Sequence, residues 1–211
     1  MAEIRPLLEN NNAWASRMTA DDPAFFERLV GQQSPKFLWI GCSDSRVPAN
    51  EIVGLAPGEL FVHRNVANLV IHTDFNCLSV IEFAIEHLKV EHVIVCGHYD
   101  CGGIQAALRN DQLGLIDNWL QHIKDIYKTH ERRFAGLATQ GRSDLLSELN
   151  VVEQVFNVCR TTMCQRAWTR GQPLSVHGWI YRLNNGLLND LNVSISSQTD
   201  LEPLYRMAVS R

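Results

Sequence analysis

Two cysteines and a histidine in this 211-residue chain are spaced as metal ligands are. His98-Tyr99-Asp100-Cys101 places an imidazole and a thiol three residues apart, and Cys42 supplies a second thiol from an earlier segment. Two thiolates and one imidazole favour zinc. A structural zinc site is closed by four protein ligands, whereas three ligands leave a position for water or substrate. The pattern therefore indicates a catalytic zinc site.

Asp44 and Arg46 follow Cys42 closely enough to act at the same site. A carboxylate at Asp44 can bind the metal itself or accept a hydrogen bond from a water on the metal. Arg46 is positioned to compete for that carboxylate. We therefore interpret Asp44 and Arg46 as catalytic, with Asp44 as an additional candidate metal ligand that can leave the site open or closed.

Apolar segments that alternate with helical ones must position these residues. Lys36–Gly41 is predicted as a strand that leads into Cys42, and Glu91–Gly97 as a buried strand that ends at His98. The other expected elements are a strand at Glu59–His63, helices at Asp74–Lys89, Gly102–Arg109, Ile116–Thr129 and Ser143–Arg170, the last ended by Gly171, and a hairpin of Pro173–Arg182 and Leu187–Leu191 about Asn184-Asn185-Gly186.

This alternation predicts an α/β fold with a mostly parallel β-sheet flanked by helices and a C-terminal β-hairpin. Such folds place ligands beyond the carboxyl ends of their strands, where Cys42 and His98 lie. The first thirty residues predict two helical pieces, the second capped by Asp21-Asp22-Pro23, that form an N-terminal arm over residues 1–34. Because no repeat or flexible linker interrupts the chain, we expect a single domain, 1–211.

Composition narrows the possible partners. The formal net charge is -4, and the 19 basic residues form no stripe that could follow phosphates, which argues against nucleic acid. The apolar stretches are too short to span a membrane, and the N-terminus lacks the apolar region of a signal peptide. We therefore expect a cytoplasmic protein with reduced cysteines. Four of the six thiols are expected to be small core residues without chemistry: Cys77, Cys96, Cys159 and Cys164.

The motifs also carry a family resemblance. Cys42-Ser43-Asp44-Ser45-Arg46 together with His98-x-x-Cys101-Gly102-Gly103 resembles the paired signature of β-carbonic anhydrases. Phe61–Asn68 and His177-Gly178-Trp179 resemble the bacterial branch, so the similarity covers essentially the whole chain. The resemblance implies reversible hydration of carbon dioxide to bicarbonate, zinc ligands Cys42, His98 and Cys101, the orienting pair Asp44 and Arg46, and Gln33 as a substrate-side hydrogen-bond donor.

The charges of the ligands predict a mechanism, and the resemblance implies its regulation. With three histidine ligands, the zinc-bound water of a carbonic anhydrase has a pKa of about 7. Two thiolates cancel the charge of the ion, so we expect the zinc-bound water to be less acidic than with three histidines. Zinc-bound hydroxide is then expected to attack carbon dioxide mainly at alkaline pH. At lower pH we expect Asp44 to bind the zinc and close the site. Some members of the family are inhibited by bicarbonate in a pocket of a Trp, an Arg and a Tyr, to which Trp39, Arg64 and Tyr181 correspond. We expect the same allosteric regulation here.

Other functions remain open at this stage. A zinc hydrolase of a carbon dioxide analogue, such as carbonyl sulfide or carbon disulfide, would carry the same motifs, and a non-catalytic bicarbonate sensor would keep the metal site. A thiol oxidoreductase is disfavoured because the chain lacks a Cys-x-x-Cys pair. The remaining histidines, His63 and His177 among them, are expected to have no partner at metal spacing. The resemblance implies a homodimer, with the N-terminal helices wrapping a partner, or a homotetramer of two dimers.

Overall fold

A computed structural model describes residues 4–31, 33–109 and 111–207 and divides the chain into two compact units, Met1–Ser34 and Pro35–Arg211. The first unit holds helices α1 (Arg5–Asp21) and α2 (Phe25–Gly31), which confirms the two predicted helical pieces. The ring of Trp14 packs edge-on against Phe25 and Phe26. Before α2, Asp22 accepts a hydrogen bond from the backbone N–H of Ala24. The unit is thus a helical pair joined by a capped turn.

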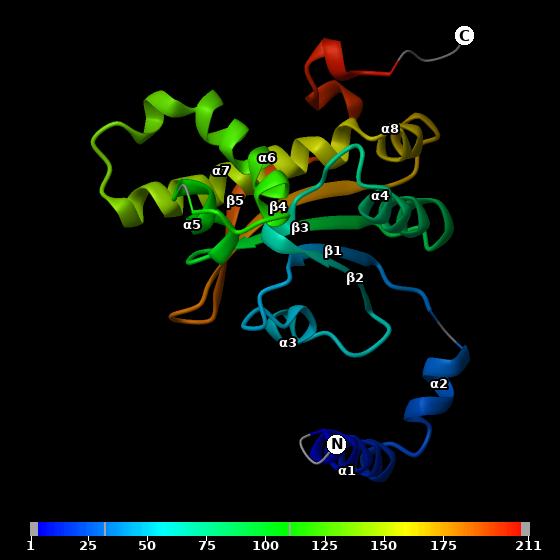
Figure 1. Cartoon of the computed structure of the whole chain (residues 1–211). Helices are drawn as coiled ribbons and strands as arrows, with labels where there is room; N and C mark the ends of the chain where they lie inside the picture. The colour runs from blue at the N-terminus through cyan, green and yellow to red at the C-terminus, as the bar shows by residue number, and fades with distance from the viewer. Residues whose placement is uncertain (1–3, 32, 110, 208–211) are drawn as a thin grey trace. The chain divides into compact units, whose positions relative to one another are not determined.

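A five-stranded sheet organises the second unit (Figure 1). Its order is β2 (Leu60–Asn65), β1 (Phe37–Cys42), β3 (His92–His98), β4 (Ser175–Arg182) and β5 (Leu187–Ile195). The first four strands are parallel, and β5 pairs antiparallel with β4. The predicted α/β fold with a mostly parallel sheet is therefore confirmed. The hairpin is confirmed as well, with Gly186 at a φ of 72° that glycine adopts without strain.

Helices cover the sheet and fill the connections between its strands. They are α3 (Ala49–Val53), α4 (Phe75–Glu82), which continues as a π-helical turn (Phe83–His87), α5 (Gly102–Leu108), α6 (Ile116–Thr129), α7 (Thr139–Arg160) and α8 (Thr162–Thr169). Single 3-10 turns lie at Val66–Asn68, Glu131–Phe134, Gln198–Asp200 and Pro203–Tyr205. No helix among the described residues is long and apolar enough to cross a membrane.

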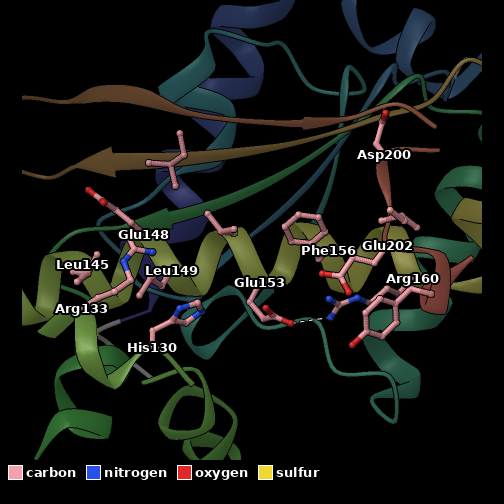
Figure 2. A pocket seen from close by; sticks show the side chains of 14 residues that line it. His130, Arg133, Leu145, Glu148, Leu149, Glu153, Phe156, Arg160, Asp200 and Glu202 are labelled. Carbon is pink, nitrogen blue, oxygen red and sulfur yellow. Dashed lines mark hydrogen bonds and ion pairs between the residues drawn. The ribbon is translucent and has the colours of Figure 1, made fainter. Parts of the chain in front are cut away.

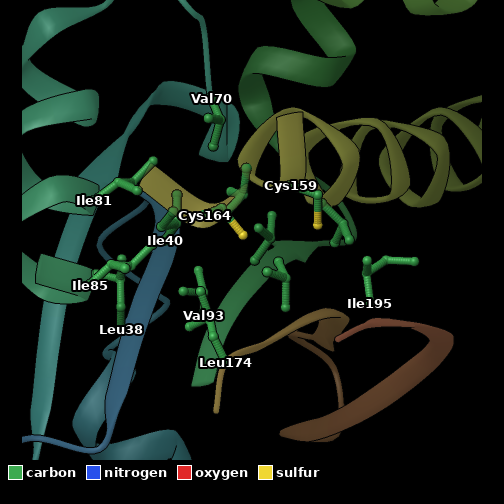
Figure 3. Packing of buried hydrophobic residues seen from close by; sticks show 14 of the residues in the cluster. Leu38, Ile40, Val70, Ile81, Ile85, Val93, Cys159, Cys164, Leu174 and Ile195 are labelled. Atoms are coloured by element: carbon green, nitrogen blue, oxygen red, sulfur yellow. The ribbon is translucent and has the colours of Figure 1, made fainter. Parts of the chain in front are cut away.

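Three apolar clusters form the core. The largest packs β1, β3 and β4 against α4, α7 and α8, and Figure 3 shows Leu38 and Val93 of the sheet beside Ile81 of α4 and Cys159 and Cys164 of the later helices. A second cluster packs α5, α6 and α7 around Cys42 and Cys101 at the carboxyl ends of the strands. The third lies around Trp39 and includes residues of α3. Cys77, Cys96, Cys159 and Cys164 are all fully buried, as predicted.

One predicted helix is wrong. The expected helix Ser143–Arg170 is two helices, because Thr161 has extended backbone angles between α7 and α8. The hydroxyl of Thr161 accepts a hydrogen bond from the backbone N–H of Cys164 and so caps α8. The periodic apolar pattern continues through this break because both helices bury a face in the same cluster. The short helix α3 was not predicted.

Candidate metal centre

Strands β1 and β3 end side by side, and each ends in a predicted ligand. Cys42 is the last residue of β1, His98 is the last residue of β3, and the two strands are parallel neighbours. Beyond His98 the chain turns at Asp100, whose φ of 56° is left-handed, and Cys101 then occupies the position just before α5. This turn brings the Cys101 thiol to the end of β1.

The three predicted ligands meet at this point. One ligand atom each from Cys42, His98 and Cys101 lies within 4.8 Å of the other two, and the two sulfur atoms are 3.9 Å apart. The residues are 5%, 1% and 2% exposed, respectively. Each thiol or imidazole is thus removed from solvent and directed at a common centre.

His98 is oriented for metal binding by its own loop. Its Nδ1 donates a hydrogen bond of 2.9 Å to the carbonyl of Tyr99, which fixes the tautomer and leaves a lone pair on Nε2. That Nε2 is buried and has no hydrogen-bond partner among the described residues. A buried acceptor without a partner is costly, and a metal ion would satisfy it. Two sulfurs and this nitrogen form a donor set that fits Zn²⁺.

The two thiols ionise as a pair. The pKa of Cys42 is lowered, first by the hydrogen bond between the two thiols, and the pKa of Cys101 is raised by the same contact and by burial. Because the two sulfurs are 3.9 Å apart, loss of the first proton belongs to the pair rather than to either thiol. Binding of a divalent ion would displace the remaining proton. The pair is therefore suited to hold a cation as two thiolates.

Asp44 lies beside the centre and is held by Arg46. Its Oδ2 is 3.7 Å from Nε2 of His98. The guanidinium donates two hydrogen bonds, 2.9 Å from Nε and 2.7 Å from Nη2, and the backbone N–H of Arg46 donates a third. These bonds hold the pKa of Asp44 well below its usual range, with the Arg46 side chain as the largest cause. Asp44 is thus an ionised acceptor next to the metal centre.

Trp39, Arg64 and Tyr181, the predicted bicarbonate residues, occupy one face of the sheet. Arg64 pairs with Gly41, two residues beyond Trp39, and Tyr181 pairs with His98 across β3 and β4. Trp39 and Tyr181 belong to the same apolar cluster. The indole Nε1 of Trp39 is buried, lies over Gly41, and has no hydrogen-bond partner in the described part of the chain.

Arg64 contacts the metal-binding loop directly. Its Nε donates a hydrogen bond of 2.8 Å to the carbonyl of Cys42, and its Nη2 donates to the carbonyl of Asp44. These are the backbone oxygens of a metal ligand and of the adjacent carboxylate residue. The predicted anion residue is thus bonded to the loop that carries Asp44.

Gln33 is exposed and belongs to the N-terminal unit, so its assignment as a substrate-side donor stays a prediction. One contact of the centre had no signal in the sequence. The backbone N–H of Ala67 donates to the sulfur of Cys42 at 3.4 Å. A main-chain donor is present at every residue except proline, so only the path of the chain can reveal it.

A second group of potential ligands was not expected. His63 lies within 4.8 Å of Asp74 and Cys77, so the expectation that it has no neighbour at metal spacing is wrong. Each member has a structural role, however. Asp74 caps α4 by accepting the N–H of Asn76, His63 contacts the side-chain amide of Asn65, and burial raises the pKa of Cys77 to about 12. We therefore assign this group to the packing of α4 on β2.

Comparison with known proteins decides the family. The family profile described as carbonic anhydrase matches residues 37–188. A β-carbonic anhydrase of Coccomyxa, solved with acetazolamide, has a TM-score of 0.91 at 42% identity, and the match covers 95% of this chain and 91% of that one. The chain belongs to the β-carbonic anhydrases. It is therefore an enzyme of carbon dioxide hydration, whose substrates are carbon dioxide and bicarbonate.

Other proteins similar to this β-carbonic anhydrase are carbonic anhydrases as well. The carbonic anhydrase of Emericella nidulans is 46% identical over 203 residues, which cover 95% of this chain and 89% of the relative. A tetrameric β-carbonic anhydrase of the filamentous ascomycete Sordaria macrospora has a TM-score of 0.88 at 37% identity, over 93% of this chain and all of that one. Because these similarities are to fungal and Coccomyxa proteins, the bacterial branch indicated by the motifs stays a prediction.

Proposed function

We propose that Cys42, His98 and Cys101 bind one Zn²⁺ and that carbon dioxide is hydrated beside it. The observation that carries this proposal is the buried Nε2 of His98, which has no hydrogen-bond partner among the described residues and lies within 4.8 Å of two thiols whose sulfurs are 3.9 Å apart. When bound, zinc would lower the pKa of a water ligand and so supply the nucleophile, with two thiolate ligands mainly at alkaline pH.

Asp44 orients the reacting oxygen in this proposal. As an ionised carboxylate, Asp44 can accept a hydrogen bond but cannot donate one. It therefore selects a hydroxyl group that donates to it, and this bond fixes the direction of the lone pairs that remain on the hydroxyl oxygen. Arg46 holds the carboxylate in position with two side-chain bonds and one backbone bond. The pair thus orients the nucleophile and leaves the metal position next to His98 free for chemistry.

A matched pair of cysteine variants tests the metal site. Cys42→Ser is expected to lose zinc and carbon dioxide hydration, whereas Cys159→Ser, which changes an equally buried thiol in the apolar core, retains both. Zinc is measured by mass spectrometry on purified protein and turnover by stopped-flow. Equal zinc in the two variants would contradict the ligand assignment. Wild-type protein with one zinc and no turnover at any pH would favour hydrolysis of carbonyl sulfide or carbon disulfide, or a bicarbonate sensor.

We also propose that Asp44 switches the enzyme with pH. The carboxylate is bonded to Arg46 in this structure, and its Oδ2 is already 3.7 Å from Nε2 of His98, so a short movement would take it from Arg46 to the metal position. Neutral water competes for a metal less well than hydroxide does, so acid conditions favour the closed arrangement. Activity is therefore expected to rise with pH.

Bicarbonate inhibition through Trp39, Arg64 and Tyr181 is proposed on two observations. The indole N–H of Trp39 is a buried donor in need of an acceptor, and Arg64 bonds the carbonyl of Asp44. An anion that draws the Arg64 guanidinium toward Trp39 competes with that bond and releases the Asp44 loop. Trp39→Phe is expected to reduce inhibition by bicarbonate. A wild-type dose response in that variant would contradict this regulation and the bicarbonate-regulated type.

We propose a homodimer or homotetramer as the assembly. The family resemblance and the tetrameric relative of Sordaria macrospora support it. The first unit also presents apolar side chains such as Leu7, Leu8 and Val30 to solvent in the single chain. Light scattering on the full chain tests it, since a monomer at micromolar concentration would exclude both assemblies.

A further inference from the structure

The loop that supplies the N–H donor to Cys42 is strained. Ala67 and Asn68 have φ values of 65° and 50°, so two successive non-glycine residues adopt the left-handed conformation. Alanine is unfavourable there, because its Cβ approaches the carbonyl oxygen, and such residues persist only where their surroundings determine them. The conformation directs the backbone N–H of Ala67 at the Cys42 sulfur, 3.4 Å away. The strained residue is thus the one whose N–H contacts a proposed zinc ligand.

A stripe of buried amides on α7 holds this loop. Asn150 donates a hydrogen bond of 2.9 Å to the carbonyl of Ala67, and Gln154 accepts one of 2.9 Å from the N–H of Val70. Gln154 in turn donates to the side chain of Asn150. Asn157 donates to the carbonyl of Val70 and to Gln154. Asn150 and Gln154 are each only 1% exposed.

The spacing of these amides explains how they act together. Positions 150, 154 and 157 share one face of a helix, and that face meets the loop after β2. Buried amides without partners destabilise a protein, so each retained amide must have its bonds satisfied. Here the bonds go to the strained loop and to one another. Asn150 is the member that bonds Ala67 itself, at the carbonyl of the peptide unit that follows the one carrying the Ala67 N–H.

We propose that Asn150 is a positioning residue for the zinc ligand Cys42, because its bond to the carbonyl of Ala67 holds the left-handed backbone angles of that residue, and these angles direct the N–H of the preceding peptide unit at the ligand sulfur. The inference rests on the proposed zinc site. A hydrogen bond from a backbone N–H draws electron density from a thiolate, so it adjusts both the affinity for the metal and the charge that the ligand donates to it. Without Asn150, Ala67 is expected to relax away from the left-handed conformation, which would turn its N–H from the sulfur and weaken this bond.

Two leucine variants separate positioning from general packing. Asn150→Leu and Asn157→Leu each remove one amide of the same stripe and keep a branched side chain of similar shape. Asn157 bonds Val70 and does not bond Ala67, so it is the matched control. Asn150→Leu is expected to weaken Zn²⁺ binding about 10- to 100-fold in chelator competition. It is also expected to shift the sulfur-to-cobalt charge-transfer band of the Co²⁺ form. Asn157→Leu should keep the wild-type band and affinity, and equal changes in both variants, or in neither, would overturn the proposal.

If a variant does not fold, a measurement on the wild type still tests the hydrogen bond on which the proposal depends. In protein loaded with ¹¹³Cd²⁺, the amide proton of Ala67 is expected to show scalar coupling to the metal through the Cys42 sulfur. Its absence, while the Cys42 β-protons do couple to cadmium, would overturn the proposal and leave the metal site intact. If the Cys42 β-protons also show no coupling, the assignment of Cys42 as a ligand fails instead.

Discussion

Replacing Arg46 with alanine is expected to move the pH profile of carbon dioxide hydration about one unit toward alkaline pH. Arg46 donates side-chain hydrogen bonds of 2.9 and 2.7 Å to Asp44. Without them Asp44 has no competing cation and turns more readily to the metal. The closed arrangement then gains population at neutral pH, and the open one returns only where hydroxide competes more strongly.

The magnitude follows from the exposure of the pair. Hydrogen bonds to charged groups contribute about 1.5–3 kcal/mol when they are shielded, and exposed ion pairs about 0–1 kcal/mol. The side chain of Asp44 is 15% exposed and that of Arg46 is 56% exposed, so we take about 1–2 kcal/mol for both bonds together. Since about 1.36 kcal/mol corresponds to one pH unit, the profile moves by roughly one unit.

Stopped-flow hydration of zinc-loaded protein between about pH 6.5 and 9.5 measures this shift around the reference pKa of zinc-bound water. Arg109→Ala is the control for loss of an arginine from such a pair, because Arg109 pairs with Asp111 two residues away at 3.0 Å and its side chain, 63% exposed, resembles that of Arg46. That variant is expected to keep the wild-type profile. An unshifted profile for Arg46→Ala, with one zinc per chain, would refute the competition between Arg46 and the metal for Asp44.

Three further predictions concern the fold. Lys89 is exposed at a φ of 57°, so Lys89→Gly is expected to raise the free energy of unfolding by about 0.5–1 kcal/mol, and denaturant titration with no gain would contradict this. Burial lowers the pKa of His63, so the unfolded chain binds more protons and stability falls as pH drops below about 6.5. His63→Gln should make the melting temperature less dependent on pH between about 5 and 7, and an unchanged slope would argue against this linkage. A Cβ at Gly41 would overlap the indole of Trp39, so Gly41→Ala should cost about 1–3 kcal/mol, whereas wild-type stability would show that the indole can move.

The sequence was most informative where chemistry and periodicity coincide. The strands before Cys42 and His98 are short apolar runs that end at polar residues, and the structure places both strand ends together. The helix Ile116–Thr129 agrees with its predicted bounds, because its apolar positions recur along one face and its neighbours are loops. Both predictions depended on local patterns.

Features that depend on distant segments were not predictable. The break at Thr161 separates two helices that share one apolar cluster, so periodicity alone could not locate it. The proximity of His63, Asp74 and Cys77 arises because α4 folds back over β2, and spacing along the chain does not encode that contact. Arg64 was assigned to an anion pocket by resemblance, yet its bonds to the metal-binding loop became visible only in three dimensions.

The 3.9 Å between the sulfurs of Cys42 and Cys101 has a practical consequence for anyone who prepares the metal-free enzyme. A disulfide requires the two atoms to approach to about 2.05 Å, a short movement for side chains at the ends of a strand and a turn. A bound ion occupies both thiolates and keeps them from reacting with each other. Chelation in air would therefore expose the protein to intramolecular oxidation, after which added zinc could not restore activity. Metal exchange should be carried out under a reductant, with free thiols titrated before and after reloading.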